Sequence, residues 1–227
     1  EDSAGNNIAS QNTQTYGFKT SITFPTTAGS AHSCYMLDNG SVKCWGKNNL
    51  GQLGLGDANN RGDELNQMGD NLTAINLGTG RTATAIAAGG NHTCAILDNS
   101  SIKCWGYNAS GQLGLGDTNN RGDGSNQMGD NLTAINLGTG RTATAIEAGG
   151  NHTCAILDDA SLKCWGKNNL GQLGLGNTSN RGDGSNQMGD NLSAVDLGTG
   201  RTATAIEAGG NHTCAILDDA SLKCWGS

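Results

Sequence analysis

Proline and aromatic residues are scarce in this 227-residue chain, which has one proline (Pro25), two phenylalanines and 4% aromatic residues in all. No stretch approaches the roughly 20 consecutive apolar residues of a membrane-spanning helix, so we expect no membrane span. No basic segment followed by an apolar one opens the sequence, so we expect any signal peptide to have been removed. Basic residues are also few, and the net charge is -7. Such a chain repels phosphate backbones, which argues against nucleic acid as a partner.

Glycine is abundant, and one stretch of sequence recurs along the chain. The chain has 37 glycines, and the phrase that runs from His32 to Gly46 returns at His92, His152 and His212, sixty residues apart each time. A fixed period of this length is typical of an array in which each unit buries its apolar face against a neighbour. A residue that recurs in every unit is therefore a poor candidate for a unique active site.

One unit contains several short strand signals and a long polar loop. We expect strands at 82–86, 93–97, 101–105 and 132–137, with the polar loop at 117–131. No window shows the period of 3.6 residues that marks an amphipathic helix. Four strands per unit are typical of a propeller blade. The tryptophans then pack between blades; they are Trp45, Trp105, Trp165 and Trp225.

The eight cysteines form four pairs, each flanking a short hairpin. With a three-residue tip at 38–40, Leu37 faces Ser41 and Cys34 faces Cys44. If Leu37 and Ser41 close the hairpin with hydrogen bonds, the two cysteines occupy a non-hydrogen-bonded position, with Cα atoms about 4.5 Å apart and within disulfide range. The predicted disulfides are Cys34–Cys44, Cys94–Cys104, Cys154–Cys164 and Cys214–Cys224.

Free thiols and metal binding are the alternatives to these disulfides. Zinc knuckles place their ligands two to four residues apart, which the wider spacing here does not match. Disulfides imply an oxidising compartment, so we expect a protein that is secreted or displayed at a cell surface.

The unit resembles the regulator of chromosome condensation repeat family. The resemblance rests on Ala-Gly-Gly-x-His-Thr-Cys-Ala-Ile-Leu at 88–97, Lys-Cys-Trp-Gly at 103–106, and Gly-Gln-Leu-Gly-Leu-Gly at 51–56, 111–116 and 171–176. It implies an all-β fold, a β-propeller of about four 60-residue blades. Propellers of this family usually close with seven blades. About 3.8 units therefore imply a small ring closed by the N-terminal segment, a ring shared by two chains, or a part of a longer polypeptide, which we favour.

The same alignment divides the chain. We expect a divergent capping or ring-closing segment at 1–30, followed by tandem repeats at about 31–90, 91–150, 151–210 and a partial unit at 211–227. The founding member of the family is a nuclear exchange factor for a small GTPase. The acidic charge and the paired cysteines argue against that role here.

The polar loop carries the side chains best suited to a ligand. Its oxygen donors, set among glycines, would suit calcium. Asn and Asp that cap turns are the alternative. No other cofactor is expected. The candidate calcium ligands are Asp117, Asn119, Asp123, Asn126 and Asp130.

Three other repeated features favour structural explanations. Arg-Gly-Asp at 61–63, 121–123 and 181–183 spells an integrin-recognition tripeptide, but three copies at one repeat position fit turn chemistry better. The four repeated histidines lack a distinct catalytic partner and are expected to donate structural hydrogen bonds. Among many Asn-x-Ser/Thr sequences, Asn108 and Asn177 are the candidate glycan carriers.

These observations predict a secreted, non-catalytic structural or adhesive module of an extracellular protein or assembly. It would bind a protein partner or assemble with itself. A soluble binder or inhibitor of a protein is the alternative. A lectin is less favoured, because tryptophans buried between blades cannot stack on sugars.

Overall fold

The computed structural model describes residues 26–227 and folds them into four three-stranded antiparallel sheets. Blade 1 contains β1 (Thr26–Ala28), β2 (His32–Met36) and β3 (Val42–Gly46), and blade 2 contains β4 (Ala83–Ala88), β5 (His92–Leu97) and β6 (Ile102–Gly106). Blade 3 contains β7 (Ala143–Ala148), β8 (His152–Leu157) and β9 (Leu162–Gly166), and blade 4 contains β10 (Ala203–Ala208), β11 (His212–Leu217) and β12 (Leu222–Gly226).

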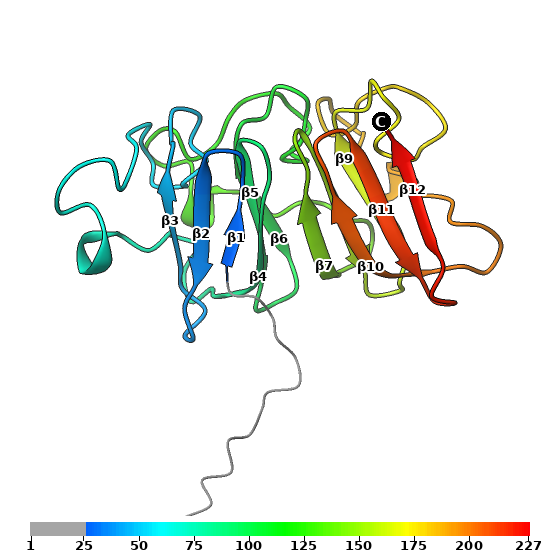
Figure 1. Cartoon of the computed structure of the whole chain (residues 1–227), viewed down its shortest axis with the longest axis horizontal. Coiled ribbons are helices and arrows are strands. Elements are labelled where there is room, and N and C mark those ends of the chain that lie inside the picture. The colour runs from blue at the N-terminus through cyan, green and yellow to red at the C-terminus, as the bar shows by residue number, and fades with distance from the viewer. Residues whose placement is uncertain (1–25) are drawn as a thin grey trace, which may run out of the picture.

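The blades stand side by side in chain order (Figure 1). The first strands contact one another along the inner side, β1 with β4, β4 with β7 and β7 with β10. Each blade therefore runs outward from its first strand to its third, as in a propeller. This arrangement confirms the predicted all-β propeller architecture.

The stapled hairpins have the predicted register. Cys34 pairs with Cys44 and Met36 with Val42, and the Leu37 N–H donates to the Ser41 carbonyl. The paired Cα atoms lie 4.1 Å apart in every blade, and all eight cysteines form the four predicted disulfides. At the hairpin tip Gly40 has a φ of 75°, and Ala160 takes the same left-handed conformation with a φ of 62°. The turn thus keeps its shape without glycine.

The predicted fourth strand is wrong. Residues 132–137 join no sheet, and the Ile135 N–H makes one backbone hydrogen bond, to the Ile102 carbonyl of β6. Leu132, Ile135 and Leu137 are buried at intervals of three and two residues, whereas the buried side chains of a strand recur at every second residue. The segment seals the outer edge of its blade as an irregular strap that follows the short 3-10 helix η2 (Gly129–Asn131). Equivalent helices in units 1 and 3 are η1 (Gly69–Asn71) and η3 (Gly189–Asn191).

The predicted capping segment at 1–30 is only partly described. Residues 1–25 lie outside the described residues, so a cap there stays a prediction. Thr26–Ala28 forms β1, the inner strand of blade 1, which pairs with β2. This part of the segment is therefore built into a blade.

The core lies between the blades rather than within one. Blade 1 contributes Cys34, Val42 and Cys44 to a cluster with Leu97 and Trp105 of blade 2. Trp105 and Trp165 are fully buried, which confirms inter-blade packing for these two tryptophans. Trp45 and Trp225, in the first and last blades, are only half-buried.

In blades 2 and 3 a buried lysine joins the blade to the connecting segments that precede and follow it in the sequence. The Lys103 Nζ donates to the carbonyl oxygens of Leu77 and Gly129, at 3.0 and 2.8 Å. Lys163 repeats this arrangement in blade 3. No helix within residues 26–227 is long and apolar enough to cross a membrane.

Candidate functional site

The repeated His, Thr and Trp side chains meet at one backbone carbonyl between blades. Between blades 1 and 2, the Gln52 carbonyl accepts hydrogen bonds from the Thr93 hydroxyl at 2.9 Å and the Trp105 Nε1–H at 3.1 Å. The His32 Nε2 of blade 1 lies 2.8 Å from the same Thr93 hydroxyl. The set repeats between the later blades as His92, Thr153, Trp165 and Gln112, and as His152, Thr213, Trp225 and Gln172.

The shared carbonyl fixes the histidine tautomer. The Thr93 hydroxyl donates its only proton to the Gln52 carbonyl, so it can only accept a hydrogen bond from the His32 ring. The imidazole therefore carries its proton on Nε2. The Nδ1 atoms of His32, His92 and His152 are buried without a hydrogen-bond partner. A second proton there would be buried and unpaired. Burial accordingly lowers the pKa of His32 and of His152 to about 4.

The environment of these rings excludes the usual work of a catalytic histidine. Burial, and then the neighbouring histidines, lower the pKa of His92 to about 3. Its Nε2 is committed to Thr153, and the ring is 0% exposed. A general base must reach its substrate and take up a proton near the working pH. The structural role predicted for His32, His92 and His152 is confirmed by these contacts.

A buried asparagine organises each polar loop, and in the second unit it is Asn108, a predicted glycan carrier. Asn108 is 0% exposed, accepts the Leu113 N–H at 2.9 Å and donates to the Asp117 carbonyl at 2.8 Å. The prediction of a glycan on Asn108 is wrong, because its amide nitrogen is buried and already bonded. Asn177 is exposed and remains a predicted glycan carrier.

Two of the five predicted calcium donors are engaged by other partners. Asp117 forms a 2.6 Å ion pair with Arg121. Asp130 accepts the N–H and the hydroxyl of Thr79 from the preceding unit, and these hydrogen bonds hold the pKa of its carboxyl below its usual range. Asn126 has a φ of 62° in the loop turn. Within residues 26–227 no three His, Cys, Asp or Glu side chains are grouped to hold a metal. Calcium binding by these donors, with Asn119 and Asp123, stays a prediction.

The Arg-Gly-Asp tripeptide is a structural turn in units 2 and 3. Arg121 exchanges two backbone hydrogen bonds with Gly106 at the end of β6. The Gly122 carbonyl accepts the Gly56 N–H of the preceding unit at 3.0 Å, and Gly122 is buried. These contacts support the interpretation as turn chemistry over adhesion. Only in unit 1 is the central glycine, Gly62, exposed.

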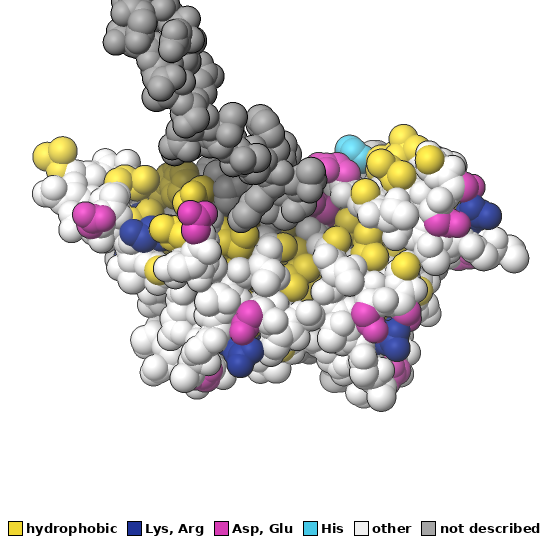
Figure 2. Space-filling view, turned by 90° about the horizontal axis from the view of Figure 1, so that it is seen from below, with side chains coloured by type: hydrophobic (Ala, Val, Ile, Leu, Met, Phe, Trp, Pro, Cys, Tyr) yellow, Lys and Arg dark blue, Asp and Glu magenta, His cyan; other side chains and the backbone are white. Residues whose placement is uncertain are grey.

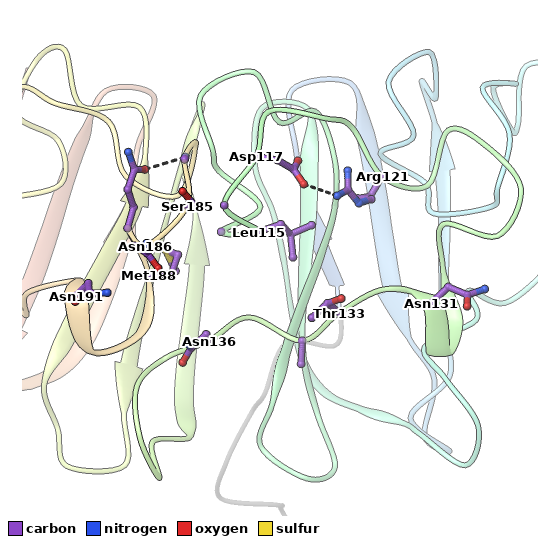
Figure 3. A pocket seen from close by; sticks show the side chains of 15 residues that line it. Leu115, Asp117, Arg121, Asn131, Thr133, Asn136, Ser185, Asn186, Met188 and Asn191 are labelled. Atoms are coloured by element: carbon purple, nitrogen blue, oxygen red, sulfur yellow. Dashed lines mark hydrogen bonds and ion pairs between the residues drawn. The ribbon is translucent and has the colours of Figure 1, made fainter.

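A groove of 510 Å³ lies on the outer side between units 2 and 3 (Figure 3). Asn186 and Asn191 of unit 3 line one side and Asn131 of unit 2 lies on the other, with Leu115 and Met188 supplying apolar surface. The three asparagine amides have no hydrogen-bond partner within residues 26–227. A similar groove between units 1 and 2 includes Asn126, Asn131 and Met128. These grooves offer repeated amide groups to a neutral hydrogen-bonding ligand.

A pair of glutamates faces the inner side of the blades. Glu147 and Glu207 line a cavity of 360 Å³ with the Gly-Gly turns that precede β8 and β11. Burial, and then the charge of Glu207, raise the pKa of Glu147 to about 7. Elsewhere basic and acidic side chains lie next to one another, as the face in Figure 2 shows. That face therefore carries no uniformly basic patch.

Comparison with known proteins identifies the repeat. The family model of the regulator of chromosome condensation (RCC1) repeat matches residues 26–52, 83–112, 143–172 and 203–227. Each match contains one disulfide-stapled hairpin. The chain belongs to the RCC1 repeat family. Its RCC1 repeats are the four blades described above.

Several characterised proteins are similar to this chain of RCC1 repeats. The chain is 28% identical over 202 residues to the ultraviolet-B receptor UVR8 of Arabidopsis thaliana, covering 88% of this chain and 40% of that protein. It is 30% identical over 174 residues to the human X-linked retinitis pigmentosa GTPase regulator, covering 76% and 16%. Yeast RCC1 (Prp20), crystallised with Kap60, matches with a TM-score of 0.63 and 19% identity, covering 88% and 43%. The chain spans less than half the length of these relatives, and the likeness to Prp20 is one of fold.

Proposed function

We propose that the chain is a non-catalytic structural or adhesive propeller module that works outside the cell. One observation carries this proposal. Blade 4 exposes the face that the other blades bury against their neighbours: Ile216 is 45% exposed and Leu222 is 65% exposed. Their counterparts in blade 2, Ile96 and Ile102, are 3% and 0% exposed. An apolar face of this kind is typical of a surface that binds another molecule, and we propose a further blade of the same kind as its partner.

The use of the chemically versatile side chains supports a role without catalysis. Histidine, tryptophan and lysine side chains join blades to one another or to the connecting segments, and the cysteines staple the hairpins. The disulfides support a location in an oxidising compartment. The crystal structure of Prp20 with Kap60 supports the more general idea that this fold binds proteins.

A soluble binder or inhibitor of a protein is the second candidate, and the outer grooves favour it. Their unpaired asparagine amides offer the donors and acceptors that a polypeptide backbone requires. A binder of this type would act as a single particle.

Light scattering on unreduced protein, with electron microscopy of the same sample, separates the two candidates. A structural module forms particles larger than one 23.1 kDa chain. Leu222→Lys then dissociates them, because it places a charge in the apolar contact. The matched control Leu170→Lys, at a leucine that is 44% exposed elsewhere, leaves them intact. A compact monomer that Leu222→Lys does not change contradicts the structural role and supports the binder.

A further inference from the structure

One Asn-x-Ser/Thr sequence lies at the same place in three units, where each short 3-10 helix ends. It begins at the last residue of η1, η2 and η3 and reads Asn71-Leu-Thr, Asn131-Leu-Thr and Asn191-Leu-Ser. In the second unit Leu132 is 2% exposed, whereas Asn131 and Thr133 are both exposed. Leu132 has an extended backbone, with a φ of -83° and a ψ of 112°, so the side chains before and after it point away from the core together.

Neither polar side chain of this sequence is used by the fold. Within residues 26–227 the Asn131 amide and the Thr133 hydroxyl make no hydrogen bond, and both line the groove between units 2 and 3 (Figure 3). Asn131 also lines the groove between units 1 and 2. Because the units on both sides of Asn131 are described, its exposure is a property of the assembled blades and not of a chain end.

The other Asn-x-Ser/Thr sequences within residues 26–227 commit one of the two polar groups to the fold. Asn99 accepts the N–H and the hydroxyl of Ser101, at 3.2 and 2.7 Å. Asn91 accepts the side-chain amide of Gln52, and the threonine that completes its sequence, Thr93, is 0% exposed. A bonded amide or a buried threonine is also found in the sequences that begin at Asn39, Asn108, Asn151, Asn177 and Asn211. The three sites after the 3-10 helices are therefore distinct from the rest.

We propose that Asn71, Asn131 and Asn191 carry N-linked glycans. The amide nitrogen forms a bond to the anomeric carbon of the first sugar of an oligosaccharide diphosphate donor. The bond from that carbon to the diphosphate oxygen breaks, the diphosphate leaves with the electron pair, and the nitrogen loses one proton. Asn-x-Ser/Thr is the acceptor sequence for this transfer in secreted proteins, so the inference rests on the proposed location outside the cell.

The outer grooves have room for the first sugars of such a glycan. The groove between units 2 and 3 has a volume of 510 Å³, and the one between units 1 and 2 has 370 Å³. Leu115 and Met188 supply apolar surface to the larger groove, and Ser185 supplies a hydroxyl. A glycan on Asn131 therefore covers the groove that a soluble binder would use, which favours the structural role over the second candidate function.

Peptide mass spectrometry of the protein from its natural source tests the proposal. The protein is digested before and after treatment with an amidase that releases N-linked glycans and leaves aspartate at each carrier asparagine. We expect sugar at Asn71, Asn131 and Asn191, and none at Asn91 or Asn108. Unmodified asparagines at the three proposed positions would overturn the proposal. Equal modification of Asn108 would overturn the reasoning from exposure, because that side chain is 0% exposed.

Two variants of Thr133 locate the modification in the whole chain secreted by a eukaryotic cell. Thr133→Val keeps the shape of an exposed side chain without the hydroxyl, and should remove the glycan from Asn131 while Asn71 and Asn191 keep theirs. Thr133→Ser keeps the hydroxyl and should keep the glycan. Equal occupancy of Asn131 in the two variants contradicts the proposal.

Light scattering distinguishes a failure of this proposal from a failure of the proposed function. Natural protein that has bare asparagines but forms particles larger than one 23.1 kDa chain refutes the glycans and leaves the structural role in place. Glycosylated protein that stays a compact monomer supports the glycans and contradicts the structural role.

Discussion

Replacing Thr153 by valine should destabilise the chain far more than an isosteric change usually does. The Thr153 hydroxyl donates to the Gln112 carbonyl at 2.9 Å and accepts from the His92 Nε2, also at 2.9 Å. Valine keeps the shape and removes both hydrogen bonds. The Gln112 carbonyl still receives the Trp165 N–H at 3.0 Å, so that side loses one bond of about 1 kcal/mol.

The larger cost falls on His92. Its Nε2–H would be buried without an acceptor, and moving the proton to Nδ1 gives no relief because that atom also lacks a partner. An unsatisfied buried donor costs about 1–3 kcal/mol, so the sum is about 2–4 kcal/mol. In a chain of this length that lowers Tm by about 5–15 °C.

Thermal and urea unfolding of Thr153→Val beside Thr118→Val provide the assay. Thr118 is exposed and makes no hydrogen bond within residues 26–227, so its replacement should change stability by less than about 0.5 kcal/mol. If the two variants unfold alike, the carbonyl-centred contact does not hold the blades together and the reasoning fails.

Three further outcomes follow from the same structure. Stability should fall as pH drops from 6.5 toward 4, by about 1.4 kcal/mol per pH unit for each buried histidine. Burial lowers the pKa of His32 and His152 to about 4, so in this range the unfolded chain binds more protons than the folded one. The pKa of Glu147 is raised to about 7, so this residue opposes the trend: its contribution to stability is lost as pH rises from about 4.5 to 7. Urea titrations of Glu147→Gln should therefore show a steeper rise of stability with pH than the parent protein. Parallel curves would contradict the raised pKa of Glu147, and a stability that does not fall between about pH 6.5 and 4 would contradict the lowered pKa of the histidines. Replacing Cys94 and Cys104 by alanine removes their disulfide and should lower the free energy of unfolding by about 2–3 kcal/mol, from the loss of chain-entropy stabilisation. In a separate test, mass spectrometry of unreduced protein should find no thiol that can be alkylated. Asn108→Ala should lower Tm by several degrees whereas Asn177→Ala should not, since only Asn108 is buried at the centre of its loop; equal shifts would refute that role.

Local rules predicted the hairpins. Alternation and a three-residue tip were enough to place Cys34 opposite Cys44, because side-chain register in an antiparallel pair follows from counting. The same reasoning failed for residues 132–137. Apolar composition indicated a strand there, but whether a neighbouring strand could bond it depended on tertiary structure, and the hydrogen bond from the Ile135 N–H to Ile102 is its one backbone bond to β6.

The site was less predictable, because its key atoms belong to the backbone. The Gln52 carbonyl receives Thr93 and Trp105 from the next unit, and no side-chain pattern marks a carbonyl. A usable signal was nonetheless present. Asn48, Asn108 and Asn168 recur at one position of the unit, which should have suggested a buried structural role for Asn108 before a glycan.

The central claim is that the repeated polar side chains hold the blades together rather than perform chemistry. Long-range ¹H–¹⁵N NMR of the histidine rings tests it most directly, with His212→Gln used to assign the remaining three. We predict that His32, His92 and His152 carry their proton on Nε2 and stay neutral at pH 5.5. Rings that titrate near pH 6.5, or that carry the proton on Nδ1, would contradict the contact and the account built on it.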